Sequence, residues 1–193
     1  MTTELFELRQ YTLVPGGLDP LVEVFEGELV GPQEDAGMRL HGRYEDLADR
    51  DRFVWMRSFP SDDARTDACT AFYTGPVWQE HRDAANATMV DSDDVLLLRE
   101  PWPGSSAGVP EGEVVATVWL LPAVVDVGTL DPDAADGGVF VTAEIPNRFP
   151  RLPVREGEHA VVVIGPGRST LLPGEPAQVM RLRPVRRRGA GTA

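Results

Sequence analysis

Apolar and polar residues alternate in three segments of the first half of the chain, which predicts strands at 5–13, 38–45 and 52–59. A fourth segment, 95–98, is continuously apolar and is typical of a buried strand. Between these segments, apolar residues recur at helical spacing. They predict one helix after the first strand and two more before the last. The order β-α-β-β-α-(α)-β over residues 4–100 is the split βαβ pattern of ferredoxin-like folds.

Local signals set the expected ends of these helices. Asp19-Pro20 suits the N-cap and first position of the first helix, and Gly31-Pro32 is expected to stop it. Ser61 suits the N-cap of the second helix. Gly75-Pro76 ends that helix and begins the third, because proline is tolerated where no backbone donor is needed.

The second half has the strand pattern of the first but few helical segments. It follows a linker at 101–112 that holds three prolines and three glycines. Strands are expected at 113–121, 139–144, 159–164 and 179–183, whereas 126–137 and 166–176 are expected to be loops or single helical turns. We therefore interpret 1–100 as a ferredoxin-like repeat, 113–185 as a degenerate, helix-poor second repeat and 186–193 as a basic disordered tail.

A four-stranded sheet with helices on one face must bury its other apolar face. We expect the two sheets to pack on each other within the chain as a pseudo-dimer, with a homodimer as a further option. Two sheets facing each other form a barrel with an interior cavity. The expected fold is thus α+β, a ferredoxin-like dimeric α/β barrel with a degenerate second half.

The composition narrows the classes of partner. The chain has 193 residues, of which 42% are apolar and 25% charged, as in a soluble globular protein. Its formal net charge of −13 argues against nucleic acid and anionic membranes as partners. Cys69 is the single cysteine, so no disulfide within the chain is possible. The start lacks a signal-peptide pattern and no long apolar run occurs, so we expect a cytoplasmic protein.

The third predicted helix presents candidate chemistry on one face. Trp78, His81 and Arg82 stand at i, i+3 and i+4, and Tyr73 comes just before the helix. Because an imidazole titrates at about pH 6.5, His81 is the candidate catalytic acid or base. Arg82 could clamp a carboxylate, while Tyr73 and Trp78 could line a pocket. The alternative is that these residues serve the helix and the core alone.

Polar residues also fall on strand faces that are expected to be buried. Arg57 is flanked by aromatic residues on its face, and an unpaired buried charge is costly. We expect Arg9, Tyr11, Trp55 and Arg57 to wall the barrel cavity, with Arg57 as a second catalytic candidate. The alternative is a structural network in which Glu7 pairs with the arginines.

A further polar set lies on the strand at 38–45. Arg39, His41 and Arg43 alternate there, so they are expected to share one face, which either holds an acidic ligand or is solvated. The histidines stand at 41, 81 and 159 and have no metal-ligand spacing, so no metal is expected.

Five segments together resemble the NIPSNAP family of the dimeric α/β-barrel superfamily. They are ELRQYTL at 7–13, GPVW at 75–78, HRDAANATM at 81–89, DSD at 91–93 and NRFPRLPVREGE at 147–158. The resemblance implies a ferredoxin-like fold and its assembly into a dimeric α/β barrel. Relatives in the wider superfamily include cofactor-free polyketide cyclases, quinone-forming monooxygenases and haem-handling proteins. A haem would need an axial ligand, for which His81 is the sole candidate, and we expect no cofactor.

Two functions fit these observations. The first is a cofactor-independent enzyme of the cyclase or isomerase type, acting on a polyketide-like or other apolar or aromatic small molecule in the barrel cavity. The second is a non-catalytic protein that binds a small molecule or serves as a scaffold. The size of the cavity discriminates between them, because a barrel filled by side chains favours the scaffold.

Overall fold

The structure, a computed structural model, describes residues 4–186. Its eight strands form a closed antiparallel barrel in the order β1-β3-β2-β8-β5-β7-β6-β4. The strands are β1 (Leu5–Leu13), β2 (Arg39–Asp46), β3 (Arg52–Phe59), β4 (Met89–Arg99), β5 (Val114–Leu121), β6 (Gly138–Thr142), β7 (His159–Gly165) and β8 (Gln178–Pro184). The basic tail predicted at 186–193 lies outside the described residues, except for Arg186.

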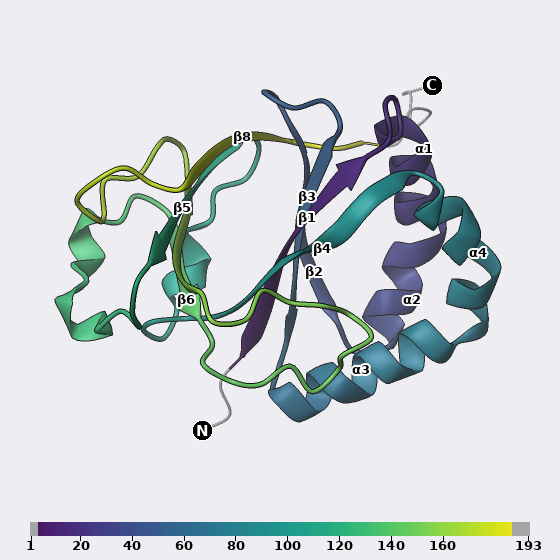
Figure 1. The fold of residues 1–193 in the computed structure, drawn as a ribbon, viewed down its shortest axis with the longest axis horizontal. Coiled ribbons are helices and arrows are strands. Elements are labelled where there is room, and N and C mark those ends of the chain that lie inside the picture. The colour runs from purple at the N-terminus through teal and green to yellow at the C-terminus, as the bar shows by residue number, and fades with distance from the viewer. Residues whose placement is uncertain (1–3, 187–193) are drawn as a thin grey trace.

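The helices lie together on one side of the barrel, over the sheet of β1 to β4 (Figure 1). They are α1 (Leu18–Val24), α2 (Val30–Asp35), α3 (Asp62–Thr74) and α4 (Pro76–Asn86). A π-helical turn, η1 (Phe25–Leu29), joins α1 to α2 without a break.

Two of the predicted helix signals are confirmed and two are wrong. Gly17, and not Asp19, is the N-cap of α1, which begins at Leu18. The hydroxyl of Ser61 accepts a hydrogen bond from the backbone N–H of Ala64, and Pro76 begins α4 directly after Gly75. By contrast, Gly31-Pro32 does not stop the first helix, which continues through α2. The wide π turn just before Pro32 displaces the carbonyl that the proline ring would otherwise meet.

The two sheets close into one barrel within this chain. This closure was predicted, because each sheet has one face without helices. At one seam β2 pairs with β8 through Tyr44 and Pro184, and at the other β4 pairs with β6 through Leu98 and Thr142. Strand β4 begins six residues before the predicted 95–98, at Met89, because its polar first part pairs with the last residues of β1.

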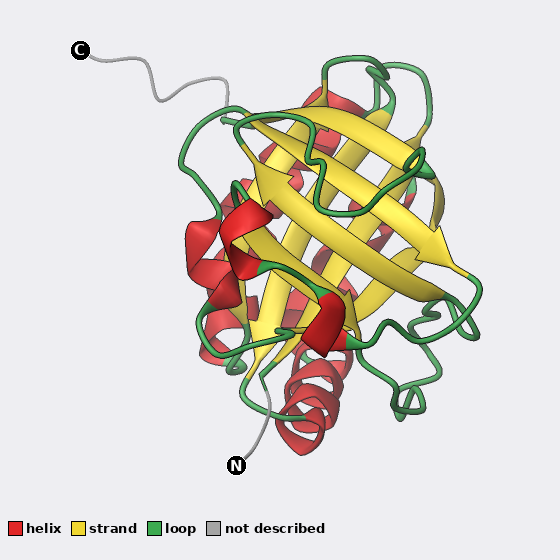
Figure 2. Cartoon of the chain, turned by 90° about the vertical axis from the view of Figure 1, so that its left-hand side faces the viewer, coloured by secondary structure: helices red, strands yellow, loops and turns green. Residues whose placement is uncertain are grey.

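The outer face of the second sheet is covered by loops instead of long helices (Figure 2). Segment 126–137 holds only the short 3₁₀ turns Val127–Thr129 and Pro132–Ala134, and 166–176 holds no helix, as predicted. Side chains from these loops, including Leu130 and Leu171, pack on the valines of β6 and β7.

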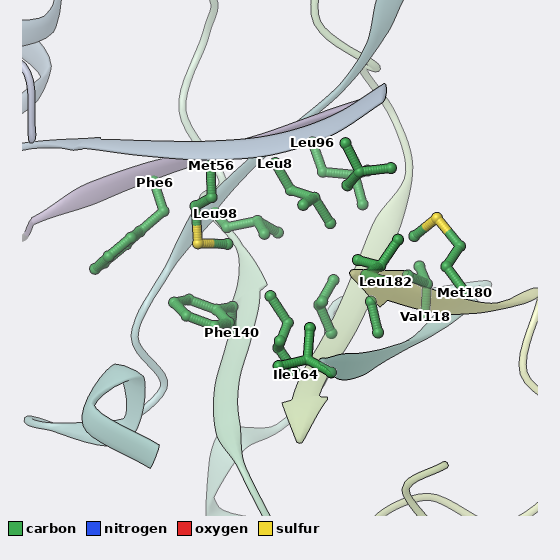
Figure 3. Packing of buried hydrophobic residues seen from close by; sticks show 14 of the residues in the cluster. Phe6, Leu8, Met56, Leu96, Leu98, Val118, Phe140, Ile164, Met180 and Leu182 are labelled. Atoms are coloured by element: carbon green, nitrogen blue, oxygen red, sulfur yellow. The ribbon is translucent and has the colours of Figure 1, made fainter. Parts of the chain in front are cut away.

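Apolar side chains from both halves pack together in the interior of the barrel. Phe6, Leu8 and Met56 extend from one sheet toward Phe140 and Ile164 of the other (Figure 3). Phe6 and Phe140 meet edge to face, with ring centroids 5.1 Å apart. The two sheets therefore share one core.

We predict that Phe140→Ala lowers the free energy of unfolding by about 3–5 kcal/mol, the usual cost of truncating a buried phenylalanine. Because both halves contribute to this core, unfolding in urea should remain a single transition. Val124→Ala, at a position that is 53% exposed, is the control and should change stability by less than about 0.5 kcal/mol. Two separate transitions in the Phe140 variant would show that the halves fold independently.

Candidate functional site

The side chains of β1 and β3 lie on the opposite faces of the sheet from those predicted. Phe6 and Leu8 point into the barrel, whereas Arg9, Tyr11 and Trp55 point toward the helices. The predicted placement of the polar face in the barrel cavity is therefore wrong. The reason is physical: the helical layer supplies polar partners for these side chains, whereas the core of the barrel is mainly apolar.

The centre of this layer is the Glu7 carboxylate, which accepts hydrogen bonds from three arginines. Arg9 Nη1 and Arg57 Nε each lie 2.8 Å from Oε2, and Arg65 Nε lies 2.6 Å from Oε1. All four side chains are buried. Cross-strand pairing positions Glu7 and Arg57, which lie directly opposite each other in the β1–β3 register. The structural Glu–Arg network that was considered as the alternative is thus present. It lies between the sheet and the helices and not inside the barrel.

The protonation of Glu7 follows from this geometry. Burial by itself acts to raise the pKa of Glu7, but attraction to Arg57, Arg9 and Arg65 outweighs burial and holds the pKa far below its usual range. The carboxylate is therefore ionised, and one negative charge faces three positive ones. This buried set, the Glu7 cluster (Glu7, Arg9, Arg57 and Arg65), carries an excess of positive charge.

An aromatic pocket lies beside the Glu7 cluster. Its lining includes Tyr11, Trp55, Tyr73 and Trp78, together with Phe25 of the π-helical turn, and it encloses about 30 Å³. Four of the predicted ligand-binding residues are therefore brought together here. This volume has room for a water molecule or two.

The arginines connect the cluster to the walls of the pocket. The guanidinium of Arg57 lies 5.2 Å from the Trp55 ring centroid, and its Nη1 donates to the Tyr73 hydroxyl at 3.3 Å. Arg9 Nε donates to the Tyr11 hydroxyl at 3.1 Å. Burial raises the pKa of Tyr73, although Arg57 opposes this, so the phenol keeps its proton at neutral pH. The indole N–H of Trp55 is buried without a hydrogen-bond acceptor among the described residues.

The other two predicted site residues lie outside this pocket. His81 is on α4 and faces Glu28, with 3.8 Å between Nε2 and the carboxylate. Arg82 is exposed and contacts Gln79 and Asp83. Trp78 points inward from the same helix. Of the three residues predicted to share a face, Trp78 therefore lines the pocket, whereas His81 and Arg82 do not.

The predicted common face holds for Arg39 and His41, which both lie beside Ser58, and is wrong for Arg43. The β2–β3 register shifts by one residue between Leu40 and Arg43, which is a β-bulge. Arg43 consequently pairs with Glu26 of η1, while His41 hydrogen-bonds to Ser58.

Three polar residues of the site were not singled out from the sequence. Arg65 stands on the buried side of α3 with Ala68, Cys69 and Phe72, at i, i+3, i+4 and i+7, and this spacing could have identified it. Gln33, which accepts from Arg57, lies beyond the expected helix stop. Asn147, which accepts from Arg65, comes from the loop after β6, and no local pattern signals such a distant contact.

Comparison with known proteins identifies the family. The model of the NIPSNAP family matches residues 6–102, which include all of the strands and helices of the first half. The chain belongs to the NIPSNAP family. The comparison with curated proteins gives no match.

Solved structures with a similar chain trace include two bacterial NIPSNAP proteins. One, from Agrobacterium tumefaciens and of unknown function, is 18% identical with a TM-score of 0.47, over 50% of this chain and 87% of its own. Another, an uncharacterized protein from Burkholderia xenovorans, is 22% identical with a TM-score of 0.46, over 50% of this chain and 84% of its own.

Residues 4–186 lack two structural features. No helix in this range is long and apolar enough to cross a membrane. No group of three or more His, Cys, Asp or Glu side chains in the same range is arranged to hold a metal ion.

We predict that Glu7→Gln lowers the free energy of unfolding by about 3–5 kcal/mol at pH 7, because it removes the carboxylate from three buried guanidinium groups. The folded-state pKa of Glu7 lies below the unfolded value, so its stabilisation is complete above about pH 4.3 and declines as the pH falls further. The difference from the unmodified protein should therefore shrink at low pH.

Urea unfolding at pH 7 and pH 3 measures both effects. The control is Glu113→Gln, which breaks an exposed pair with Arg183 and should cost less than about 1 kcal/mol. Equal losses for the two variants would contradict a buried, ionised Glu7.

Proposed function

We propose that this NIPSNAP protein binds a small aromatic anion in the pocket between the β1–β3 sheet and the helices. The observation that carries the proposal is the excess positive charge of the Glu7 cluster in a layer closed to solvent. Buried charges are ordinarily paired, because each unpaired ion loses several kcal/mol of hydration. A carboxylate or an enolate placed beside Arg9 and Arg57 would balance part of this charge.

The walls of the pocket suit an aromatic ring on such an anion. Tyr11, Trp55, Tyr73 and Trp78 present ring faces and edges, which favour offset or edge-to-face contacts with a planar ligand. The Tyr73 hydroxyl and the unpartnered N–H of Trp55 add two hydrogen-bond donors beside the arginines. A ligand acceptor would satisfy the indole, whose burial without a partner is otherwise unfavourable.

A ligand of this size requires the pocket to widen beyond its 30 Å³. Two elements form the movable wall of the pocket. The π-helical turn contributes Phe25 and Leu29, and the facing side of α4 contributes Trp78. Turns of π-helix interrupt the regular hydrogen bonding of an α-helix and occur frequently at functional sites. Rotation of these three side chains opens the pocket without disturbing the barrel.

A second candidate is cofactor-independent catalysis of the cyclase or isomerase type. The protonated phenol of Tyr73, held by Arg57, favours it, because this pair can stabilise the oxyanion of an enolate. Glu7 is unsuited as a base, since its proton affinity is low and its oxygens are engaged. The proton on the activated carbon would therefore pass to a water molecule, for which the pocket has room. His81 lies outside the pocket, so it is replaced in this proposal by Tyr73 as proton donor. Deuterium exchange at the activated carbon of benzoylacetone, followed by NMR with and without the protein, tests this activity.

We also infer that the second half is a degenerate copy of the first. In each half the serial strand order is fourth, first, third, second: β4-β1-β3-β2 and β8-β5-β7-β6. The seams β2–β8 and β4–β6 then relate the halves by an approximate two-fold axis. On this proposal, the helical pocket exists once per chain, because the second half lacks the helices that would form another.

We predict that benzoate binds to the protein and that benzamide, its neutral counterpart, binds at least about tenfold more weakly. Tyr73→Phe removes one hydroxyl and keeps the ring, so it should weaken benzoate binding about 10- to 150-fold, the scale of a hydrogen bond to a charged group. Isothermal titration calorimetry measures both. Tyr44→Phe is the matched control, because its hydroxyl lies in the barrel, and it should leave the affinity unchanged. Equal affinity for benzoate and benzamide would remove the anion site.

A further inference from the structure

A second cavity opens at one end of the barrel, on the opposite side of the sheet from the Glu7 cluster. We call it the mouth cavity; it measures about 760 Å³ and lies between β2 and the linker segment 106–112. This volume falls within the range of small-molecule sites. Its apolar lining continues the core of the barrel and consists of Phe6, Leu8, Met56, Phe140, Ile164 and Leu182.

The β-bulge in β2 brings His41 into the wall of this cavity. One additional residue is accommodated between Leu40 and Arg43, at His41-Gly42. Gly42 leaves room for the Tyr44 side chain, because a Cβ atom at this position would meet the ring and hydroxyl of Tyr44. Bulges re-aim side chains and occur often beside functional sites. His41 consequently lines the cavity and contacts the Phe6 ring, with centroids 5.7 Å apart.

A chain of hydrogen bonds fixes the tautomer of His41. The Ser58 hydroxyl donates its one proton to the Glu4 carboxylate at 2.7 Å, and Ser58 Oγ lies 2.8 Å from His41 Nε2. Nε2 must therefore carry the proton that Ser58 accepts. Burial lowers the pKa of His41, an effect that Glu4 opposes and Arg39 reinforces, so the ring is neutral at pH 7. The remaining nitrogen, Nδ1, is an acceptor to which none of residues 4–186 donates a hydrogen bond.

We propose that the mouth cavity binds an apolar molecule with a phenol or enol hydroxyl, which donates its hydrogen bond to Nδ1 of His41. The ring system of the ligand would lie on Phe6 and Phe140, which line the cavity. Arg39 pairs in register with Ser58 beside this point and favours the negative charge that gathers on a donating hydroxyl oxygen. This site is independent of the anion pocket, because it takes a neutral donor and lies inside the barrel.

Calorimetry with 2-naphthol and 2-methoxynaphthalene tests the proposal, since the second probe has the same rings and no hydroxyl proton. We expect 2-naphthol to bind about tenfold more tightly. His41→Phe keeps a ring and removes the acceptor, so it should abolish that preference, whereas the control His81→Phe should leave it intact. Equal affinities in the unmodified protein, or a preference that survives in His41→Phe, would overturn the proposal.

A second variant locates the probe without altering the polar chain. Ala107 is exposed on the rim, so Ala107→Trp should leave the fold intact, fill the opening and reduce 2-naphthol affinity at least about tenfold. Tyr73→Phe, in the anion pocket, should have no effect. Binding that survives Ala107→Trp and falls in Tyr73→Phe would assign the probe to the other pocket and contradict this inference.

The tautomer can be observed directly. In a long-range ¹H–¹⁵N spectrum, the signals of His41 are identified by their loss in His41→Phe. We expect the Nε2–H tautomer in the free protein and an upfield shift of Nδ1 when 2-naphthol is added. A proton on Nδ1 in the free protein would overturn the proposal, because no acceptor would then face the cavity.

Discussion

One carboxylate, that of Glu7, holds three guanidinium groups in the dry layer between the sheet and the helices. Removing these ions from water is costly, and the cost is offset only where each charge has well-placed partners. The partners come from β1, β3, α3 and the loop after β6, with Asn147 reaching Arg65 from the second half. The packing of the helices on the sheet is thus tied to this one ionised group.

The Glu7 cluster also explains why the two faces of β1 and β3 differ. On the helix side, Arg9 and Arg57 lie over aromatic rings and donate to hydroxyl and amide oxygens. On the barrel side, Phe6, Leu8 and Met56 meet the second sheet and form an apolar core. Two kinds of cavity follow: a small polar aromatic pocket among the helices and a larger apolar cavity where the core of the barrel reaches its mouth.

Much of the fold could be predicted from the sequence, because its signals are local. Alternation in 5–13 and 52–59 matched β1 and β3 to the residue, and the glycines and prolines of 166–176 excluded a helix there. The errors arose where tertiary structure overrides a local signal. A π turn allowed the helix to continue past Gly31-Pro32, and the polar start of β4 is a strand because β1 pairs with it.

The candidate site was predicted in its residues but not in its position. Alternation along a strand shows which residues share a face, and it cannot tell which face meets the helices. Tyr11, Trp55 and Tyr73 therefore came together as expected, on the other side of the sheet. His41 was separated from Arg43 by a bulge of one residue, which the pattern of the strand does not reveal.

The packing of the helices on the sheet depends most directly on an ionised Glu7 in the folded protein. The ¹³C carboxyl shift of Glu7, in protein labelled at glutamate and assigned by its loss in Glu7→Gln, reports that charge as the pH is lowered. Because the arginines hold the pKa far below its usual range, the shift should stay at its ionised value until the protein unfolds in acid. A titration in the folded state with a midpoint at about pH 4.3, the ordinary value for glutamate, would contradict the account.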